Sequence, residues 1–145
     1  MAETQKLEQR DETPGIEEYC ALRTSCGLAP RSIEAAAKGL PNSLYSTTVR
    51  SGREIVGMGR VVGDGGCNYE VVDIAVHPDF QRRGIGKMIM TQIMAFIRRA
   101  APESAYVCLI ADHHSPALYS QFGFEFTSPN SVGMAQTVNA SKLPE

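Results

Sequence analysis

The stretch from Val71 to Met90, VVDIAVHPDFQRRGIGKMIM, constrains the fold more than any other part of this 145-residue chain. Its first six residues are apolar enough to predict a strand buried on both faces. From Ile85 to Ile97 apolar residues recur at helical spacing, so a long amphipathic helix is expected, ending near Ala100. The stretch therefore predicts a strand, a glycine-containing loop and a helix in direct succession.

The preceding residues predict a helix pair followed by a hairpin. QKLEQR indicates a short first strand, and Thr13 with Pro14 resembles the capped start of a helix over about 14–24. A second helix is expected to open on Pro30 and to close on Gly39. SLYSTTVR and EIVGMGRVVG are β-rich and form the hairpin, and CNYEVVDIAV forms a third antiparallel strand.

After the long helix, the sequence predicts a strand in SAYVCLIA, a short helix in SPALYSQF and a final strand in GFEFTS. The length and a hydrophobic content of 43% fit one domain, expected over residues 13–135. Residues 1–12 are a polar N-terminal segment and residues 136–145 a C-terminal tail.

Composition excludes several classes of partner. A net charge of −2 and a pI near 5.9 give no general attraction for nucleic acid. No apolar stretch approaches the roughly 20 residues that cross a bilayer, so no membrane association is expected. The four cysteines show no CxxC spacing and the first residues lack a signal-peptide layout, which favours reduced thiols in the cytoplasm, with the nucleus also compatible.

The loop between strand and helix has the features of an anion site. The first N–H groups of a helix lack internal partners and carry partial positive charge. Gly84 and Gly86 let a phosphate approach the backbone, and Arg82, Arg83 and Lys87 add charge at the rim. The alternative is that the glycines serve only the turn. Neither GxxxxGK[ST] nor GxGxxG fits, because Met88 follows Lys87 and Ile89 occupies the third glycine position.

The pattern that fits is Q/R-x-x-G-x-G/A, present as QRRGIG from Gln81 to Gly86. With VVDIAV before it and ALYSQFGFEF after it, the chain resembles the GNAT superfamily of acetyl-CoA-dependent N-acetyltransferases over about residues 14–127. The resemblance implies a mixed α/β fold of α+β type. Its central, mostly antiparallel twisted sheet would be flanked by about four helices, and a splayed parallel strand pair, DIAV and YVCLIA, would hold CoA.

The resemblance also implies a set of acetyl-CoA contacts. Main-chain groups of Ile74 to Val76 would pair with the pantetheine arm like an added strand, and one N–H near Ile74 or Val76 would stabilise the oxyanion of a tetrahedral intermediate. N–H groups of residues 82–87 would hold the pyrophosphate. Asp112 occupies a pantetheine-contacting position where many relatives carry asparagine. The implied cofactor-binding residues are Ile74, Ala75, Val76, Gln81, Arg82, Arg83, Gly84, Ile85, Gly86, Lys87, Asp112 and Tyr119.

Three residues are candidates for the chemistry. Tyr119 matches the tyrosine that protonates the departing thiolate in many relatives, although alone it reads as a core residue of a short helix. Glu70 matches the base of histone-type relatives and Asp73 an acid of small-molecule relatives. Strand alternation places these two carboxylates on opposite faces unless a bulge intervenes, and a solvated or structural role stays open for either.

The resemblance implies transfer of acetyl from acetyl-CoA to a primary amine, on a small molecule, directly in a ternary complex. A protein or peptide lysine, an N-terminal amine, and a non-catalytic acyl-CoA sensor are the alternatives. A homodimer is compatible with the sequence. No metal is expected, because adjacent His113 and His114 cannot converge on one ion and no third ligand is evident.

Overall fold

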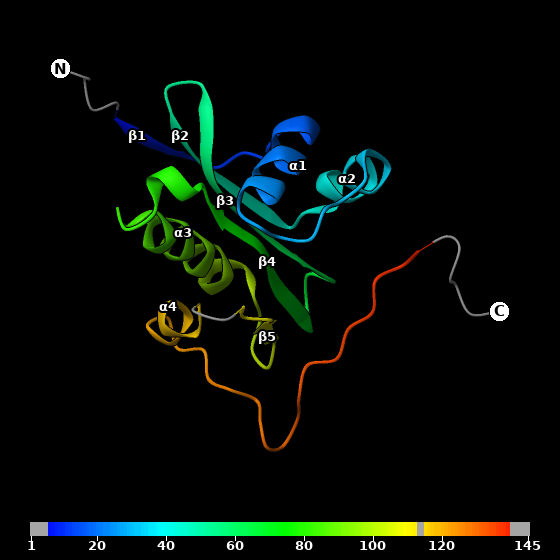
Figure 1. The fold of residues 1–145 in the computed structure, drawn as a ribbon. Helices are drawn as coiled ribbons and strands as arrows, with labels where there is room; N and C mark the ends of the chain where they lie inside the picture. Colours follow the sequence, from blue (N-terminus) through cyan, green and yellow to red (C-terminus); the bar gives the residue numbers. More distant parts are fainter. Residues whose placement is uncertain (1–5, 113–114, 140–145) are drawn as a thin grey trace.

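The computed structural model describes residues 6–112 and 115–139 and contains one mixed sheet. Its strands follow one another in chain order from β1 to β5 (Figure 1). The first four are antiparallel neighbours and β4 pairs with β5 in parallel. They are β1 (Leu7–Arg10), β2 (Tyr45–Ser51), β3 (Glu54–Gly63), β4 (Asn68–Val76) and β5 (Tyr106–Leu109).

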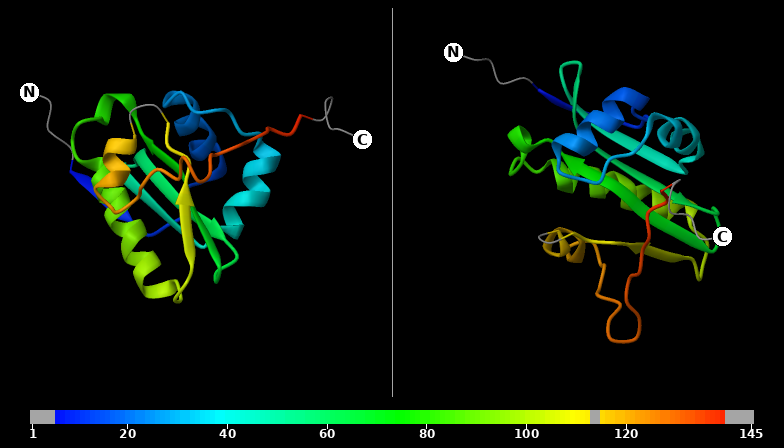
Figure 2. Two further views of the ribbon diagram at one scale, coloured as in Figure 1. Left: turned by 90° about the horizontal axis from the view of Figure 1, so that it is seen from below. Right: turned by 45° about the vertical axis from the view of Figure 1, so that its right-hand side comes forward.

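Helices cover both faces of the sheet, as the left view of Figure 2 shows. The helix α1 (Ile16–Ser25) and the shorter α2 (Ile33–Gly39) lie on one face, followed by the turn η1 (Leu40–Asn42). The helix α3 (Ile85–Ala100) and the shorter α4 (Pro116–Ser120) lie on the other, with the turn η2 (Pro78–Phe80) before α3. These two layers give the architecture that the sequence predicted.

The main core lies between α3 and the sheet. Its helical stripe is completely or almost completely buried and consists of Ile85, Ile89, Met90, Ile93 and Ile97. Gly59 in β3 makes this contact close, because a Cβ at that position would lie 2.6 Å from Cγ2 of Ile89. The absence of a side chain there lets α3 approach the middle of the sheet.

Two helix starts differ from the prediction. The first helix begins at Ile16, not after Thr13, because the N-cap is Gly15, whose N–H donates a hydrogen bond of 2.9 Å to the Glu18 side chain in the first turn. The second begins at Ile33 rather than at Pro30, because the Ser32 hydroxyl accepts the Ala35 N–H at 3.0 Å.

The end of β4 has buried residues on both faces, as predicted, because Val71 packs in the α3 core and Ala75 in the α1 core, while Val72, Ile74 and Val76 are partly exposed beyond the end of β5. One strand prediction was wrong. The stretch GFEFTS forms no strand in the described chain, because no neighbouring strand hydrogen-bonds to it. The N-terminal strand was predicted correctly.

In the described part of the chain, no helix combines the length and apolar character that spanning a membrane requires.

Candidate active site

A pocket opens where the parallel strands β4 and β5 separate. Their pairing runs from Asn68 opposite Tyr106 to Val71 opposite Leu109, and β4 then continues for five residues without β5 beside it. A cavity of about 810 Å³ occupies this gap and extends to the loop between α1 and α2. The splayed strand pair that the resemblance implied is therefore present and forms a site large enough for a ligand.

The loop between β4 and α3 presents free donors beside this pocket. In the described ranges, the backbone N–H groups of residues 82–87 donate to no acceptor. The first backbone hydrogen bond of α3 is donated by the Met88 N–H to the Gly84 carbonyl at 3.0 Å. Gln81 lines the pocket. Arg82, Arg83 and Lys87 are exposed at the rim. The arrangement can accept an anion, as the sequence predicted from the loop.

The two glycines of this loop have different structural roles. Gly84 has a φ of 80°, a left-handed conformation that favours glycine. A Cβ on Gly86 would lie 3.2 Å from Cδ2 of Leu118, so this glycine also allows α4 to pack closely on α3. Sequence reasoning assigned Gly86 to phosphate access, with the turn itself as the alternative, and missed its contact with the helix that carries Tyr119.

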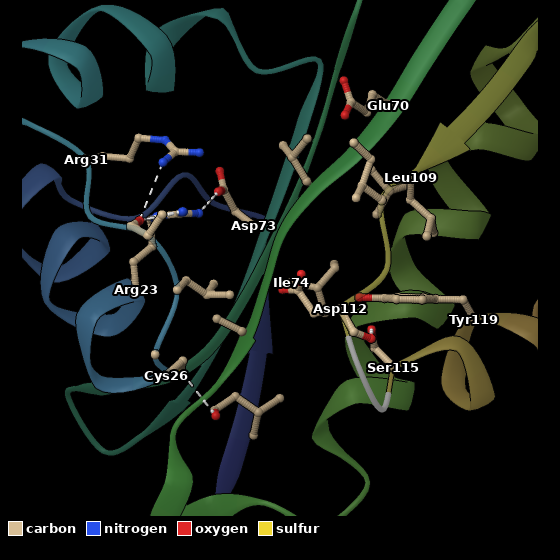
Figure 3. A pocket seen from close by; sticks show the side chains of 18 of the residues that line it. Arg23, Cys26, Arg31, Glu70, Asp73, Ile74, Leu109, Asp112, Ser115 and Tyr119 are labelled. Atoms are coloured by element: carbon tan, nitrogen blue, oxygen red, sulfur yellow. Dashed lines mark hydrogen bonds and ion pairs between the residues drawn. The ribbon is translucent and has the colours of Figure 1, made fainter. Parts of the chain in front are cut away.

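Tyr119 lies at the pocket wall opposite β4. Its side chain is buried to 8% exposure, and its ring meets the Phe124 ring edge-on at 6.4 Å between centroids. Figure 3 shows its hydroxyl pointing across the pocket toward Ile74. Burial raises the pKa of the Tyr119 phenol above its ordinary value, so the hydroxyl keeps its proton at neutral pH. The residue is positioned to donate a proton into the gap.

A bulge in β4 decides how the two candidate carboxylates are oriented. Met58 pairs with Ala75 and Arg60 with Val72, so two residues of β4 face one residue of β3. Within the bulge Asp73 has a φ of 58°, in the left-handed region. The bulge reverses the alternation, and Asp73 points to the same face as Glu70 instead of the opposite one. This is the exception that the sequence analysis left open.

The Asp73 carboxylate is fully engaged by a buried network from α1 and β3. It accepts hydrogen bonds from Arg23 at 2.5 Å, from Arg60 at 2.7 Å and from the Tyr19 hydroxyl at 3.0 Å. The side chains of Asp73, Arg23 and Arg60 are only 5%, 6% and 10% exposed. Such a carboxylate holds the bulge in place, and its oxygens are not free to take a proton from a ligand.

Glu70, unlike Asp73, has a carboxylate without bonding partners among the described residues. It lies partly exposed in the pocket lining, opposite Cys108 of β5, and in the described residues its carboxylate has no hydrogen bond or ion pair. Figure 3 shows Glu70 at the same end of the pocket as Arg31, which extends from the loop after α1. Of the two predicted bases, Glu70 is the one with free oxygens.

The remaining predicted contacts surround the same gap. Ile74, Ala75, Val76 and Asp112 all line the pocket. The Val76 carbonyl already accepts the Gln81 side-chain amide at 3.3 Å and the Cys26 thiol at 3.2 Å, so it holds Gln81 against the strand. Ile85 instead points into the core and is 1% exposed. His113 and His114 lie outside the described residues.

Sequence reasoning assigned no site residue to the wall that α1 and its following loop contribute. Arg23 lies among the buried residues of α1. A charged residue on the buried side of a helix indicates a buried partner of opposite charge, and this was the sequence signal that could have revealed the wall. The Arg23 guanidinium also donates to the Ala29 carbonyl at 2.6 Å and 2.9 Å, which fixes the loop over the pocket. The further lining residues are Cys26, Gly27, Leu28, Ala29, Arg31, Val71, Val72, Leu109, Ile110 and Ser115. Among the described residues no group of three metal-ligating side chains gathers.

A comparison with family profiles identifies this arrangement. The acetyltransferase (GNAT) domain matches residues 44–126, more than half of the chain. The chain belongs to the GNAT acetyltransferase family. The GNAT match begins at the strand β2 and ends beyond α4, so it includes β4, the anion loop, α3 and Tyr119.

Solved structures and curated relatives agree with this GNAT assignment. A crystal structure from methicillin-resistant Staphylococcus aureus, described as a protein of unknown function and probable acetyltransferase, superposes with a TM-score of 0.89 and 44% identity over 92% of this chain and all of that one. Uncharacterized N-acetyltransferases of Porphyra purpurea and Pyropia yezoensis are 35% and 28% identical over 51% and 75% of this chain. The chain spans only 41% and 62% of the length of these two relatives.

Proposed function

We propose that this chain transfers the acetyl group of acetyl-CoA to a primary amine of a small molecule, directly in a ternary complex. The observation that carries the proposal is the gap between β4 and β5, with the Tyr119 hydroxyl pointing into it from one wall. Membership of an acetyltransferase family supports the same reaction class.

The free donors of the structure fit acetyl-CoA. The unpaired N–H groups of residues 82–87 suit its pyrophosphate, and β4 beyond Val71 has an open edge for the amides of its pantetheine arm. Acetyl-CoA supplies an activated acyl group and a thiolate leaving group. The backbone near the Asp73 bulge would place an N–H against the thioester oxygen, where negative charge develops.

The side chains would handle the two protons of the reaction. As the amine nitrogen bonds to the acyl carbon, Glu70 would accept its proton, directly or through water, because its oxygens have no other partner among the described residues. As the carbon–sulfur bond breaks, the Tyr119 hydroxyl would give its proton to the thiolate. Asp73 would act through the bulge and not as a base, since three donors already occupy it.

The shape of the pocket supports a small acceptor. The loop from Cys26 to Arg31 covers one side of the cavity and is fixed there by Arg23. A lysine or N-terminal amine of a protein and a sensor without turnover remain the alternatives to be tested. The absence of nucleic-acid and membrane partners, and a cytoplasmic location, stay predictions.

The test is to incubate the protein with acetyl-CoA and a panel of small amines and lysine peptides while following free thiol. The proposal expects thiol release that depends on a small amine, with a product heavier by one N-linked acetyl group. Log(kcat/KM) should rise between about pH 6 and about pH 9, because the neutral amine is the nucleophile. Acetyl-CoA binding without any turnover would favour the sensor, and an O-acetyl product or a flat pH profile would contradict the proposal.

A further inference from the structure

Positive charge exceeds negative charge where the loop after α1 meets the sheet. The buried carboxylate of Asp73 is the shared ion-pair partner of two arginines, Arg23 and Arg60. Arg31 adds a third guanidinium, which lines the same pocket as Asp73. In the part of the chain that the structure describes, Arg31 forms no ion pair, and its hydrogen bonds to two carbonyls of its own loop are long, at 3.5 and 3.4 Å. Arg31 is exposed, so its side chain can turn toward an anion without breaking a strong contact.

A second, smaller cavity of about 120 Å³ lies between α1, α2 and β3. Arg31 lines both cavities, and Arg60 lines the smaller one. The Arg60 side chain is only 10% exposed, and its Nε donates to Asp73 at 2.7 Å. Its Nη1 donates to the Ser43 hydroxyl at 2.7 Å and to the Gly39 carbonyl at 3.5 Å, whereas Nη2 has no acceptor among the described residues. The free N–H groups of Nη2 are available to a ligand oxygen in this cavity.

An unpaired negative charge lies at the same end of the larger pocket. Figure 3 shows two side chains entering that end from different walls, Glu70 from β4 and Arg31 from the loop after α1. No ion pair joins them or links either to another described residue. A ligand with an amine at one end and an anionic group at the other would complement both charges at once.

We propose that the acceptor is an amine that also carries an anionic group, a carboxylate or a phosphate, and that Arg31 and Arg60 bind this group. The planar fork of a guanidinium matches the oxygens of either anion. With the anion held there, the amine of the acceptor lies toward Glu70, where its proton can be accepted. The proposal rests on the acetyl transfer proposed above, because it names the class of amine that this reaction uses.

Acetylation of matched amines by the full chain tests this substrate class. Amino acids with a terminal amine and a chain of increasing length are compared with their uncharged amides, and aminoalkyl phosphates with the corresponding amino alcohols. Each kcat/KM is corrected for the fraction of neutral amine. At least one anionic series should be preferred by about tenfold or more, because it gains hydrogen bonds between charged groups, and the preferred series identifies the anion. Turnover of uncharged amines as fast as both anionic series would overturn the proposal and leave the reaction intact.

A matched pair of variants tests the role of Arg31. Arg31→Gln removes the charge at an exposed side chain, and the preference for the anionic amine should fall toward equality. Arg53→Gln makes the same change at an exposed arginine in the turn between β2 and β3 and should keep the wild-type preference. The measured quantity is a ratio of two kcat/KM values, which a general loss of folded protein does not alter. An unchanged ratio in Arg31→Gln would overturn the proposal.

NMR signals of the arginine Nε–H groups give a second measurement that needs no turnover. In isotope-labelled protein with coenzyme A present, at least one anionic amine should shift the signals of Arg31 and Arg60, and its uncharged counterpart should not. Shifts confined to Arg82 and Arg83 would place the anion at the loop before α3, and these or an absence of shifts would overturn the proposal. Shifts of Arg31 and Arg60 without acetylation of any amine would instead overturn the proposed reaction.

Discussion

Replacing Asp73 by asparagine tests whether this carboxylate is a structural clamp. The change preserves the size of the side chain and removes the charge that neutralises Arg23 and Arg60, both at most 10% exposed. Removing one partner of a buried ion pair costs about 3–5 kcal/mol, because the remaining charges stay buried without compensation. In a domain of this size 1 kcal/mol moves Tm by about 2–4 °C, so Tm should fall by roughly 6–20 °C.

Thermal unfolding followed by circular dichroism measures this effect. Asp79→Asn is the matched control, since its side chain is 83% exposed and the change should alter the free energy of unfolding by less than about 0.5 kcal/mol. The double variant Asp73→Asn with Arg23→Met should lose less stability than the sum of the two single variants, because the two residues share one interaction. Equal Tm values for Asp73→Asn and Asp79→Asn would refute the clamp and restore Asp73 as a candidate base.

Three further predictions concern the site and the N-terminal half. Tyr119→Phe should preserve the fold and acetyl-CoA affinity and lower the single-turnover rate by about 10²- to 10⁴-fold; an unchanged rate would assign the proton to water or another group. Gly86→Val should weaken acetyl-CoA binding, measured by calorimetry, far more than Lys87→Ala, because it disturbs both the loop backbone and α4; equal losses in folded variants would count against the loop. Hydrogen bonding to Arg50 lowers the pKa of Glu18 below its usual 4.5. The Glu18–Arg50 pair therefore stabilises the folded state above about pH 4.5, and this contribution is lost as the pH falls through the pKa of Glu18 in the folded state. Arg50→Met should therefore make the free energy of unfolding, measured by urea titration, fall less steeply as the pH drops below about 4.5, and an unchanged slope would contradict the assignment.

The sequence predicted the site as far as local pattern determines it. The anion loop and the long helix follow from glycine positions and apolar spacing, which act within a few residues, whereas the parallel strand pair was implied by the resemblance to the GNAT superfamily. The bulge at Asp73 could not be predicted in this way, because it depends on Arg23 and Arg60, which come from other elements of the chain.

The prediction of a last strand failed for a related reason. The alternation of Phe122, Phe124 and Phe126 is a correct strand pattern, but a strand also needs a neighbour to pair with. The presence and position of a neighbouring strand depend on the three-dimensional arrangement of the chain and not on the local sequence. The role of Gly86 in helix packing was hidden similarly, since Leu118 is distant in the chain.

Titration of isotope-labelled protein with acetyl-CoA, followed by amide NMR shifts, tests the central claim most directly. If the gap between β4 and β5 holds acetyl-CoA through backbone donors, the amides of residues 82–87 should shift most, followed by those of Ile74 to Val76. Amides of η1, which follows α2 and does not line the pocket, should stay unchanged. Absence of binding, or shifts concentrated away from the loop and β4, would contradict the account.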